Sequence, residues 1–353
     1  MPNNEFHTNK AFGQDDQTPE NAHFFPSSSR HGALIRPGQD HFIAEEDETG
    51  LGAVDAVADD SAPTSMWGEA WNYLRRRPLF WVSSVLILLA LALALVPQLF
   101  TSTDPQYCVL ANSLDGPQPG HPFGFDRQGC DIFARTVYGA RASVAVGVLT
   151  TLLVVLIGTV FGALAGFFGG WLDTIVSRGA DIFFAIPLLL AAIVGLSALN
   201  NVWPDRGYWG GVFAVIIALA VFGWPQITRI ARGAVLEIKH LEFVDAARSL
   251  GTSKWRNLFT HIIPNALPPV IVTATVSLGV YIVAEATLSF LGIGLPPSVV
   301  SWGNDIAAAQ PQVRSGDNLH VLFFPAGALA ITVLSFMLLG DAVRDALDPK
   351  ARK

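Results

Sequence analysis

Charged residues are scarce in this sequence. Asp, Glu, Lys and Arg make up 14% of the 353 residues, while hydrophobic residues make up 51% and the mean hydropathy is +0.42. So little charge excludes an ordinary soluble domain, in which about 25% of the residues are charged. No lysine follows a glycine in the chain, so the phosphate-binding loop G-x-x-x-x-G-K-[ST] is missing. The chain therefore cannot bind and hydrolyse ATP by that route.

Cysteine is also rare. Cys108 and Cys130 are the only two, and both fall in one predicted loop on the exported side. They lack a CxxC partner and His121 alone completes no ligand set, so we expect no metal site. No catalytic triad or pair of carboxylates stands out, and we expect neither enzyme activity nor a bound cofactor. Two alternatives stay open for the cysteines: free thiols, or a disulfide that would constrain the unfolded chain by about 3 kcal/mol.

The formal net charge of −7 comes from the N-terminal segment. Residues 1–66 hold twelve acidic and three basic side chains, which leaves a charge of about +2 for the rest of the chain. This segment is rich in polar residues and proline and shows no helical or strand period, so we predict a disordered acidic cytoplasmic tail. It does not have the pattern of a secretory signal. It is either regulatory or a solvated extension, and we expect no nucleic-acid partner.

Long apolar stretches follow, and residues 79–353 are predicted to form an all-α integral membrane domain. A spanning helix needs about 20 apolar residues. Six stretches are candidates: Leu79–Phe100, Ser143–Phe168, Ile182–Asn200, Tyr208–Thr228, Pro268–Ala284 and Val321–Gly340. Lys and Arg lie mainly on one side of these spans, which places both termini in the cytoplasm.

Residues 67–78 are predicted to form an interfacial helix in contact with membrane lipid. Trp67, Trp71 and Leu74 fall on one helical face, and a basic cluster, Arg75–Arg77, follows them. The alternative is an extension of the first spanning helix. Pro78 argues against it, because proline disfavours helix at the preceding residue.

The second span carries four glycines spaced by four residues: Gly158, Gly162, Gly166 and Gly170. At this spacing they lie along one side of a helix, where a second helix can approach closely. Glycine in a helix costs about 1 kcal/mol relative to alanine, so we interpret the row as a helix-packing seam.

Glu285 is the one acidic residue inside an apolar run. A charge at the bilayer centre costs about 2.5 kcal/mol or more, which makes Glu285 a candidate functional residue in a gate region. The alternative, favoured by the following GIGLPP, is that the fifth span stops before Glu285. Glu285 would then lie at the outer interface and cap a short segment, Ala286–Leu291.

A polar insert, residues 229–264, separates the fourth and fifth spans. Its sequence from residue 242 is EFVDAARSLGTSKWRNLFTHIIP. We expect a short helix over Leu241–Ser249, a left-handed stop at Gly251, and a second helix over Thr252–His261 that Pro264 ends. The small side chains of Ala246 and Ala247 would let a partner approach closely.

The order of Asp245, Ala246, Ala247, Gly251 and Pro264 resembles the coupling loop of permease subunits in binding-protein-dependent ABC importers, although Glu is usual where this chain has Asp245. Four further stretches are similar to C-type subunits of dipeptide and oligopeptide importers: residues 121–141, 158–173, 285–305 and 338–349. The resemblance covers about residues 70–350.

The resemblance implies a type I ABC importer permease fold with six transmembrane helices in a bacterial cytoplasmic membrane. It implies that Glu242 and the five matching residues transmit motion from ATPase subunits. The implied partners are a second permease subunit, two subunits that bind ATP and Mg, and an extracytoplasmic solute-binding protein. A di- or oligopeptide is the expected solute. The alternatives are another small solute such as a nickel chelate, an autonomous ion-coupled carrier, or a membrane scaffold.

Overall fold

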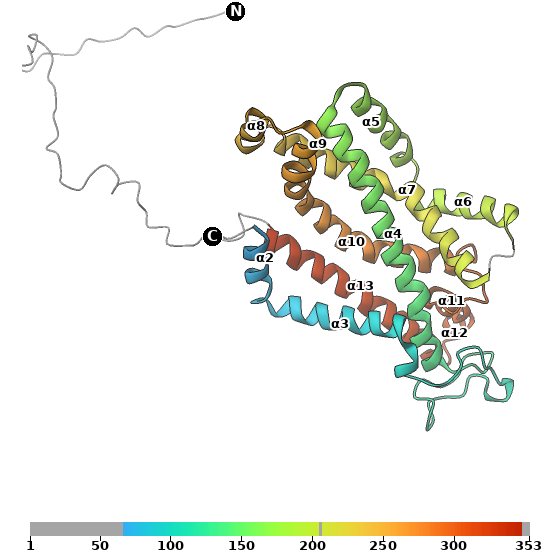
Figure 1. The fold of residues 1–353 in the computed structure, drawn as a ribbon. Coiled ribbons are helices and arrows are strands. Elements are labelled where there is room, and N and C mark those ends of the chain that lie inside the picture. Colours follow the sequence, from blue (N-terminus) through green and yellow to red (C-terminus); the bar gives the residue numbers. More distant parts are fainter. Residues whose placement is uncertain (1–65, 205–206, 348–353) are drawn as a thin grey trace, which may run out of the picture. The chain divides into compact units, whose positions relative to one another are not determined.

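The computed structural model describes residues 66–204 and 207–347, and the regular elements within these ranges are helices (Figure 1). The predicted tail, except Met66, and the last six residues of the predicted membrane domain lie outside the described residues. The α-helices are α2 (Met66–Leu74), α3 (Pro78–Leu95), α4 (Ile132–Phe168), α5 (Gly170–Phe184), α6 (Leu188–Val202), α7 (Gly207–Ile238), α8 (Glu242–Ser249), α9 (Lys254–Asn257), α10 (Ile263–Phe290), α11 (Trp302–Ala308), α12 (Gln310–Ser315) and α13 (His320–Leu347).

Five helical stretches of the described residues are long and apolar enough to cross a membrane. They are α3, α4, α7, the run Lys254–Phe290 and α13. Helices α5 and α6 pass the same test only as a pair, and their axes are bent by 86° at the break between them. The break falls at Pro187, which lacks a backbone N–H and disfavours helix at the residue before it. The predicted stretch Ile182–Asn200 is thus divided between two helices.

Helices α4 and α10 extend beyond the predicted apolar stretches. The Asp131 side chain caps α4 by accepting a hydrogen bond from the Phe133 backbone nitrogen at 2.9 Å, so the helix begins at Ile132. At 1.5 Å per residue, the 37 residues of α4 span about 55 Å, which exceeds a hydrocarbon core of about 30 Å. Helix α10 continues to Phe290, so the prediction that the fifth span breaks before Glu285 was wrong.

Three of the four predicted seam glycines lie against α7. A Cβ added at Gly158 would lie 2.7 Å from Cβ of Ile227, and one at Gly166 would lie 2.9 Å from the Arg232 carbonyl oxygen. A Cβ added at Gly162 would lie similarly close to atoms of α7. The seam prediction was wrong for Gly170, which opens α5 after α4 has ended, has a φ of +60° and meets no atom within 4 Å.

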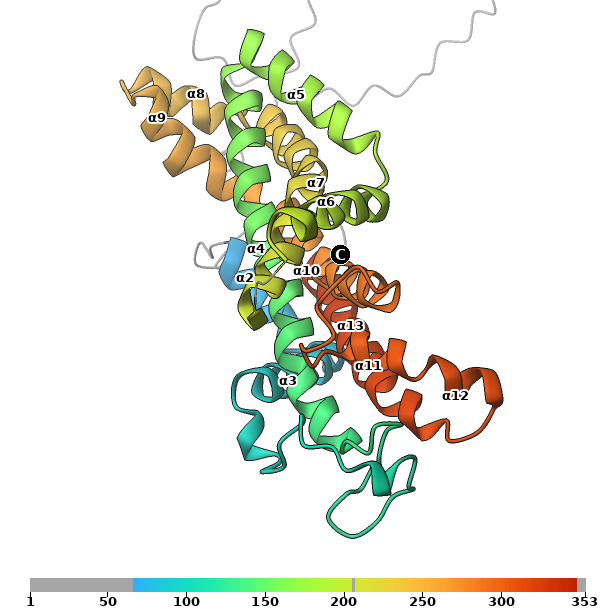
Figure 2. The same ribbon diagram turned by 90° about the vertical axis from the view of Figure 1, so that its right-hand side faces the viewer.

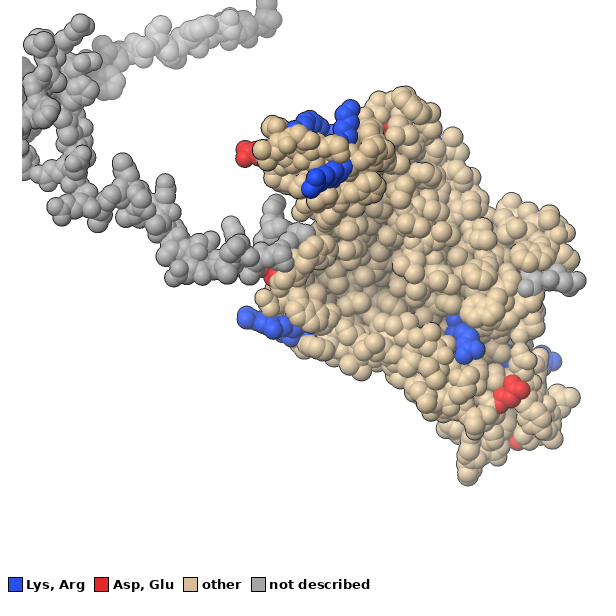
Figure 3. All heavy atoms as spheres, viewed as in Figure 1, with Lys and Arg blue, Asp and Glu red and all other residues tan. Residues whose placement is uncertain are grey.

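Helices α8 and α9 lie at one end of the described unit, and the loop of residues 101–131 lies with α11 and α12 at the other (Figures 1 and 2). Figure 3 shows few charged side chains between these ends on the face in view. Helix α2 is separate from α3, as expected from Pro78, and Trp67 and Trp71 on it are about half exposed. This distribution leaves an apolar middle between two polar ends.

Candidate functional site

The polar insert folds into two short helices joined by a tight turn, which we name the α8–α9 unit (residues 241–257). Gly251 ends the first helix with a φ of +85°, a left-handed conformation that glycine adopts without steric cost. Its backbone nitrogen donates to the Arg248 carbonyl oxygen at 3.0 Å. Ser253 then caps α9 by accepting from the Arg256 backbone nitrogen. The local sequence therefore specifies both the stop and the restart.

Buried contacts fix the α8–α9 unit to the spanning helices. Val244, on the inner side of α8, is fully buried in a cluster with Ala163 of α4, Val235 of α7 and Leu258. The side-chain nitrogen of Asn257, also buried, donates to the Val244 carbonyl oxygen at 3.3 Å. The unit therefore has a packed interior rather than the mobility of an open loop.

The outer side of α8 is exposed and carries both charged and apolar side chains. Asp245 and Ala246 are exposed, and Leu250 at the end of the helix is 87% exposed. Asp245 and Arg248 form a surface ion pair at 3.7 Å, which contributes little stability. Leu241 and Phe243 are also exposed, so this side of the unit combines small, charged and apolar side chains.

The structure brings five of the six predicted coupling residues onto this unit, namely Glu242, Asp245, Ala246, Ala247 and Gly251. The prediction that Pro264 ends the second helix was wrong. Helix α9 passes into a π-helical turn, Leu258–Ile262, and directly into α10, where Pro264 lies in the first turn. Proline is tolerated there because the backbone N–H that it lacks is not needed in the first turn of a helix. The π-helical turn before it accommodates the irregular hydrogen bonding at this point.

Glu285 is fully buried within α10, so the prediction that it caps a separate short segment, Ala286–Leu291, was wrong. Its carboxyl oxygens accept hydrogen bonds from Ser143 of α4 at 2.9 Å and from Ser289 at 2.8 Å. The sequence did not reveal these contacts of Glu285. Nothing in the apolar run that follows it indicates that a serine of another helix faces its side chain.

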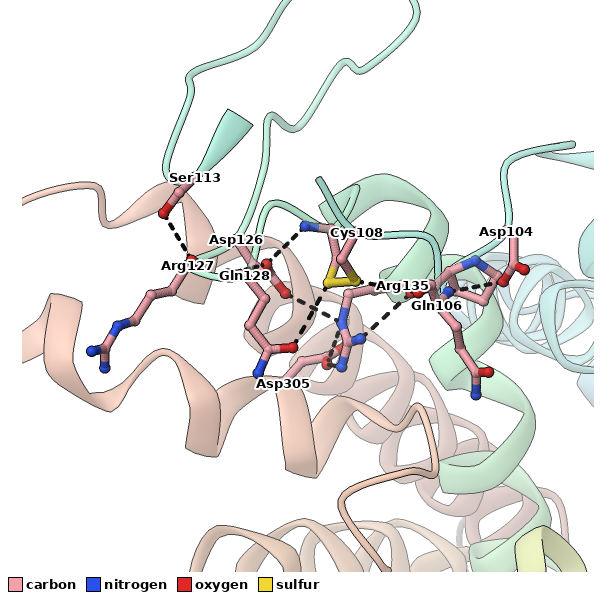
Figure 4. Close-up of a disulfide and its surroundings, with 11 residues drawn as sticks. Asp104, Gln106, Cys108, Ser113, Asp126, Arg127, Gln128, Arg135 and Asp305 are labelled. Atoms are coloured by element: carbon pink, nitrogen blue, oxygen red, sulfur yellow. Dashed lines mark hydrogen bonds and ion pairs between the residues drawn. A yellow bond between two sulfur atoms is a disulfide. The ribbon is translucent and has the colours of Figure 1, made fainter. Parts of the chain in front are cut away.

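The loop of residues 101–131 is tied together by a disulfide between Cys108 and Cys130 (Figure 4). Beneath it, Arg135 of α4 donates to Oδ1 of Asp305 through Nε, at 2.9 Å, and through Nη2. Asp126 lies 3.7 Å from the same guanidinium. Burial raises the pKa of the Asp305 carboxyl, and the charge and hydrogen bonds of Arg135 oppose that rise.

A cavity of about 620 Å³ lies beside this cluster. Side chains from three parts of the chain line it, and they include Asp126, Arg135, Ser289, Leu295, Asn304 and Asp305. Sequence reasoning missed the Arg135–Asp305 pair, because 170 residues separate the partners and neither has a local motif. Among the described residues no group of three or more His, Cys, Asp or Glu side chains could hold a metal ion.

Two family models match the sequence. Residues 158–353 match the binding-protein-dependent transport system inner membrane component, and residues 65–117 match the N-terminal TM domain of oligopeptide transport permease C.

Individual proteins match over most of the chain. The oligopeptide transport system permease protein OppC of Bacillus subtilis is 39% identical over 301 residues, which are 85% of this chain and 95% of that protein. The glutathione transport system permease protein GsiD of Pectobacterium atrosepticum is 35% identical over 303 residues, which are 86% and 97% of the two chains. A solved inward-facing structure of the MetNI methionine ABC transporter is 22% identical, covers 61% of this chain and 96% of that one, and has a TM-score of 0.49.

Proposed function

The chain belongs to the family of binding-protein-dependent transport system inner membrane components, and we propose that it is the permease subunit of an ATP-driven peptide importer. The family match over residues 158–353 carries this proposal, and this region contains the whole α8–α9 unit. Two relatives named for oligopeptide and glutathione transport support a peptide as the solute.

We propose six membrane spans, with the bent pair α5 and α6 counted as one. The long apolar helices, and the scarcity of charged side chains between the two ends on the face in Figure 3, support a multi-pass position in a bacterial cytoplasmic membrane. An even number of spans would put both termini on the same side, and the Lys and Arg residues near α2 and around the α8–α9 unit support the cytoplasm as that side. Helix α2, with its exposed tryptophans and Arg75–Arg77, then lies on the inner leaflet.

The α8–α9 unit is proposed to receive mechanical work from an ATPase. The exposed side of α8 docks on one of two partner subunits that bind and hydrolyse ATP with Mg. A second permease subunit completes the path, and a solute-binding protein docks at the opposite end, near the loop of residues 101–131. The packed interior around Val244 supports this role, because a rigid unit can pass on motion that a flexible loop would absorb.

Reconstitution into vesicles tests the proposal. The chain alone, and the chain with the four partner proteins, are supplied with ATP and a labelled oligopeptide, and peptide accumulation is measured. We expect accumulation only in the complete set. Accumulation by the chain alone would contradict an ATP-driven role, whereas transport that ignores peptides but follows another solute would contradict only the choice of substrate.

A further inference from the structure

Two hydroxyl groups, one on α4 and one on α10, converge on Glu285. Ser143 of α4 donates to one oxygen of this buried carboxyl group, and Ser289 of α10 donates to the other. No ion pair within residues 66–204 and 207–347 includes Glu285, so its hydrogen-bond partners there are hydroxyls rather than a cation. A carboxylate only accepts hydrogen bonds, so it suits a site where two hydroxyl protons meet.

Each of these hydroxyls also accepts a hydrogen bond from a backbone N–H. Ser143 Oγ accepts from the Trp302 nitrogen at 3.3 Å, and Ser289 Oγ accepts from the Leu295 nitrogen at 3.1 Å.

The direction of these hydrogen bonds follows from the donors available. A backbone N–H can only donate, so each hydroxyl must meet it with a lone pair. The single hydroxyl proton is then free to point at Glu285. The carboxylate therefore sets the orientation of both hydroxyls at once.

The backbone held in this way is residues 291–304, which we name the wall segment because it forms one side of the cavity. Leu295 and Asn304 on it line the 620 Å³ cavity together with Asp126. The wall segment lies tightly on α4, since a Cβ at Gly139 would come within 3.2 Å of the fully buried Trp302 side chain. The Trp302 indole nitrogen also donates to the Thr136 carbonyl oxygen at 2.8 Å.

We propose that Glu285 is a positioning residue that orients the hydroxyls of Ser143 and Ser289, fixes the wall segment against α4, and so shapes the surface on which the solute-binding protein docks. The docking half rests on the proposed function. The positioning half rests only on the hydrogen bonds around Glu285.

Hydrogen–deuterium exchange on the assembled complex tests the positioning half. Glu285→Gln keeps the shape of the side chain but replaces one acceptor by a donor, and Ser143→Ala removes one hydroxyl. The matched control is Ser335→Ala, because Ser335 is as fully buried but donates only to the Ile331 carbonyl oxygen of its own helix. Losing one buried hydrogen bond should speed amide exchange in the wall segment by about tenfold in the first two variants and not in the control.

Unchanged exchange of the wall segment in Glu285→Gln would overturn the proposal. Faster exchange throughout α10 and α13 would also overturn it, because Glu285 would then support the fold as a whole. If the Glu285→Gln complex fails to assemble, exchange in the Ser143→Ala variant still tests the positioning role.

ATP hydrolysis by the same complexes tests the docking half. We expect the concentration of loaded binding protein that gives half-maximal stimulation to rise at least fivefold in Glu285→Gln, with unstimulated hydrolysis unchanged. If Glu285→Gln shows fast exchange of the wall segment but a normal half-maximal concentration of binding protein, docking on this surface would be overturned. A wild-type complex that ignores the binding protein would instead refute the proposed function, and the exchange result would still decide the role of Glu285.

Discussion

Replacing Gly162 by alanine would disturb the closest contact between α4 and α7. A Cβ at this position would lie 2.5 Å from the Thr228 carbonyl oxygen and 2.8 Å from Cβ of Ala231. It would also lie 2.9 Å from the backbone nitrogen of Arg232. Backbone and Cβ atoms cannot rotate away, so α7 itself must move.

The size of the effect follows from these distances. Ordinary contact begins at 3.4 Å, so α7 must shift by roughly 1 Å to accept the methyl group. Overpacking of this kind costs about 1–3 kcal/mol. Alanine recovers up to about 1 kcal/mol through its higher helix propensity. We therefore expect Gly162→Ala to lower the free energy of unfolding by up to about 2 kcal/mol.

Gly233→Ala is the matched control, because Gly233 lies on α7 and a Cβ there would meet no atom within 4 Å. It gains the same propensity without the clash, so it should be neutral or slightly stabilising. Both variants are purified in detergent and unfolded with denaturant. If Gly162→Ala is as stable as Gly233→Ala, the two helices do not approach as closely as the structure has them.

Three further substitutions test other parts of the structure. Gly251→Val forces a β-branched residue to a φ of +85°, so we expect normal membrane levels but loss of peptide uptake; normal uptake would argue against the coupling role. Asn257→Ala removes the side-chain hydrogen bond to α8, and we expect less peptide transported per ATP hydrolysed than in Asn265→Ala, whose side chain bonds only to its own helix; equal ratios would contradict this. Asp305→Asn leaves Arg135 buried with weaker compensation, so the free energy of unfolding should fall by about 3 kcal/mol in a denaturant titration; a loss below about 1 kcal/mol would show that Asp126 suffices as its partner.

Local sequence patterns predicted the features that depend on local geometry. The four-residue glycine spacing located the contact with α7, and Gly251 located the end of α8. Pro264 misled the prediction, because proline ends a helix only when the preceding turn cannot adapt. Here a π-helical turn precedes it, and that turn depends on Leu258 and Ile262 being buried against other helices. Packing against other helices of this kind cannot be predicted from the local sequence.

Long-range pairing accounts for most of what the sequence could not reveal. Arg135 and Asp305 look like ordinary charges at the edges of apolar stretches, and Ser143 looks like any small residue of a spanning helix. Their roles arise because the wall segment folds back onto α4, which no periodicity encodes. Glu285 was recognised as unusual from its cost in an apolar run, but its partners could be named only from the structure.

Two helices connect the α8–α9 unit with the cavity at the other end. Helix α4 carries Ala163, which belongs to the same buried cluster as Val244, at one end and Arg135 at the other. The run Lys254–Phe290 begins within the α8–α9 unit and contains Glu285 near its far end. Helix α4 keeps its length because each turn is hydrogen-bonded to the next, whereas the run Lys254–Phe290 contains the π-helical turn and three prolines, Pro264, Pro268 and Pro269. Under the proposed function, α4 is therefore the more rigid of the two paths by which a displacement of α8 would reach the wall segment.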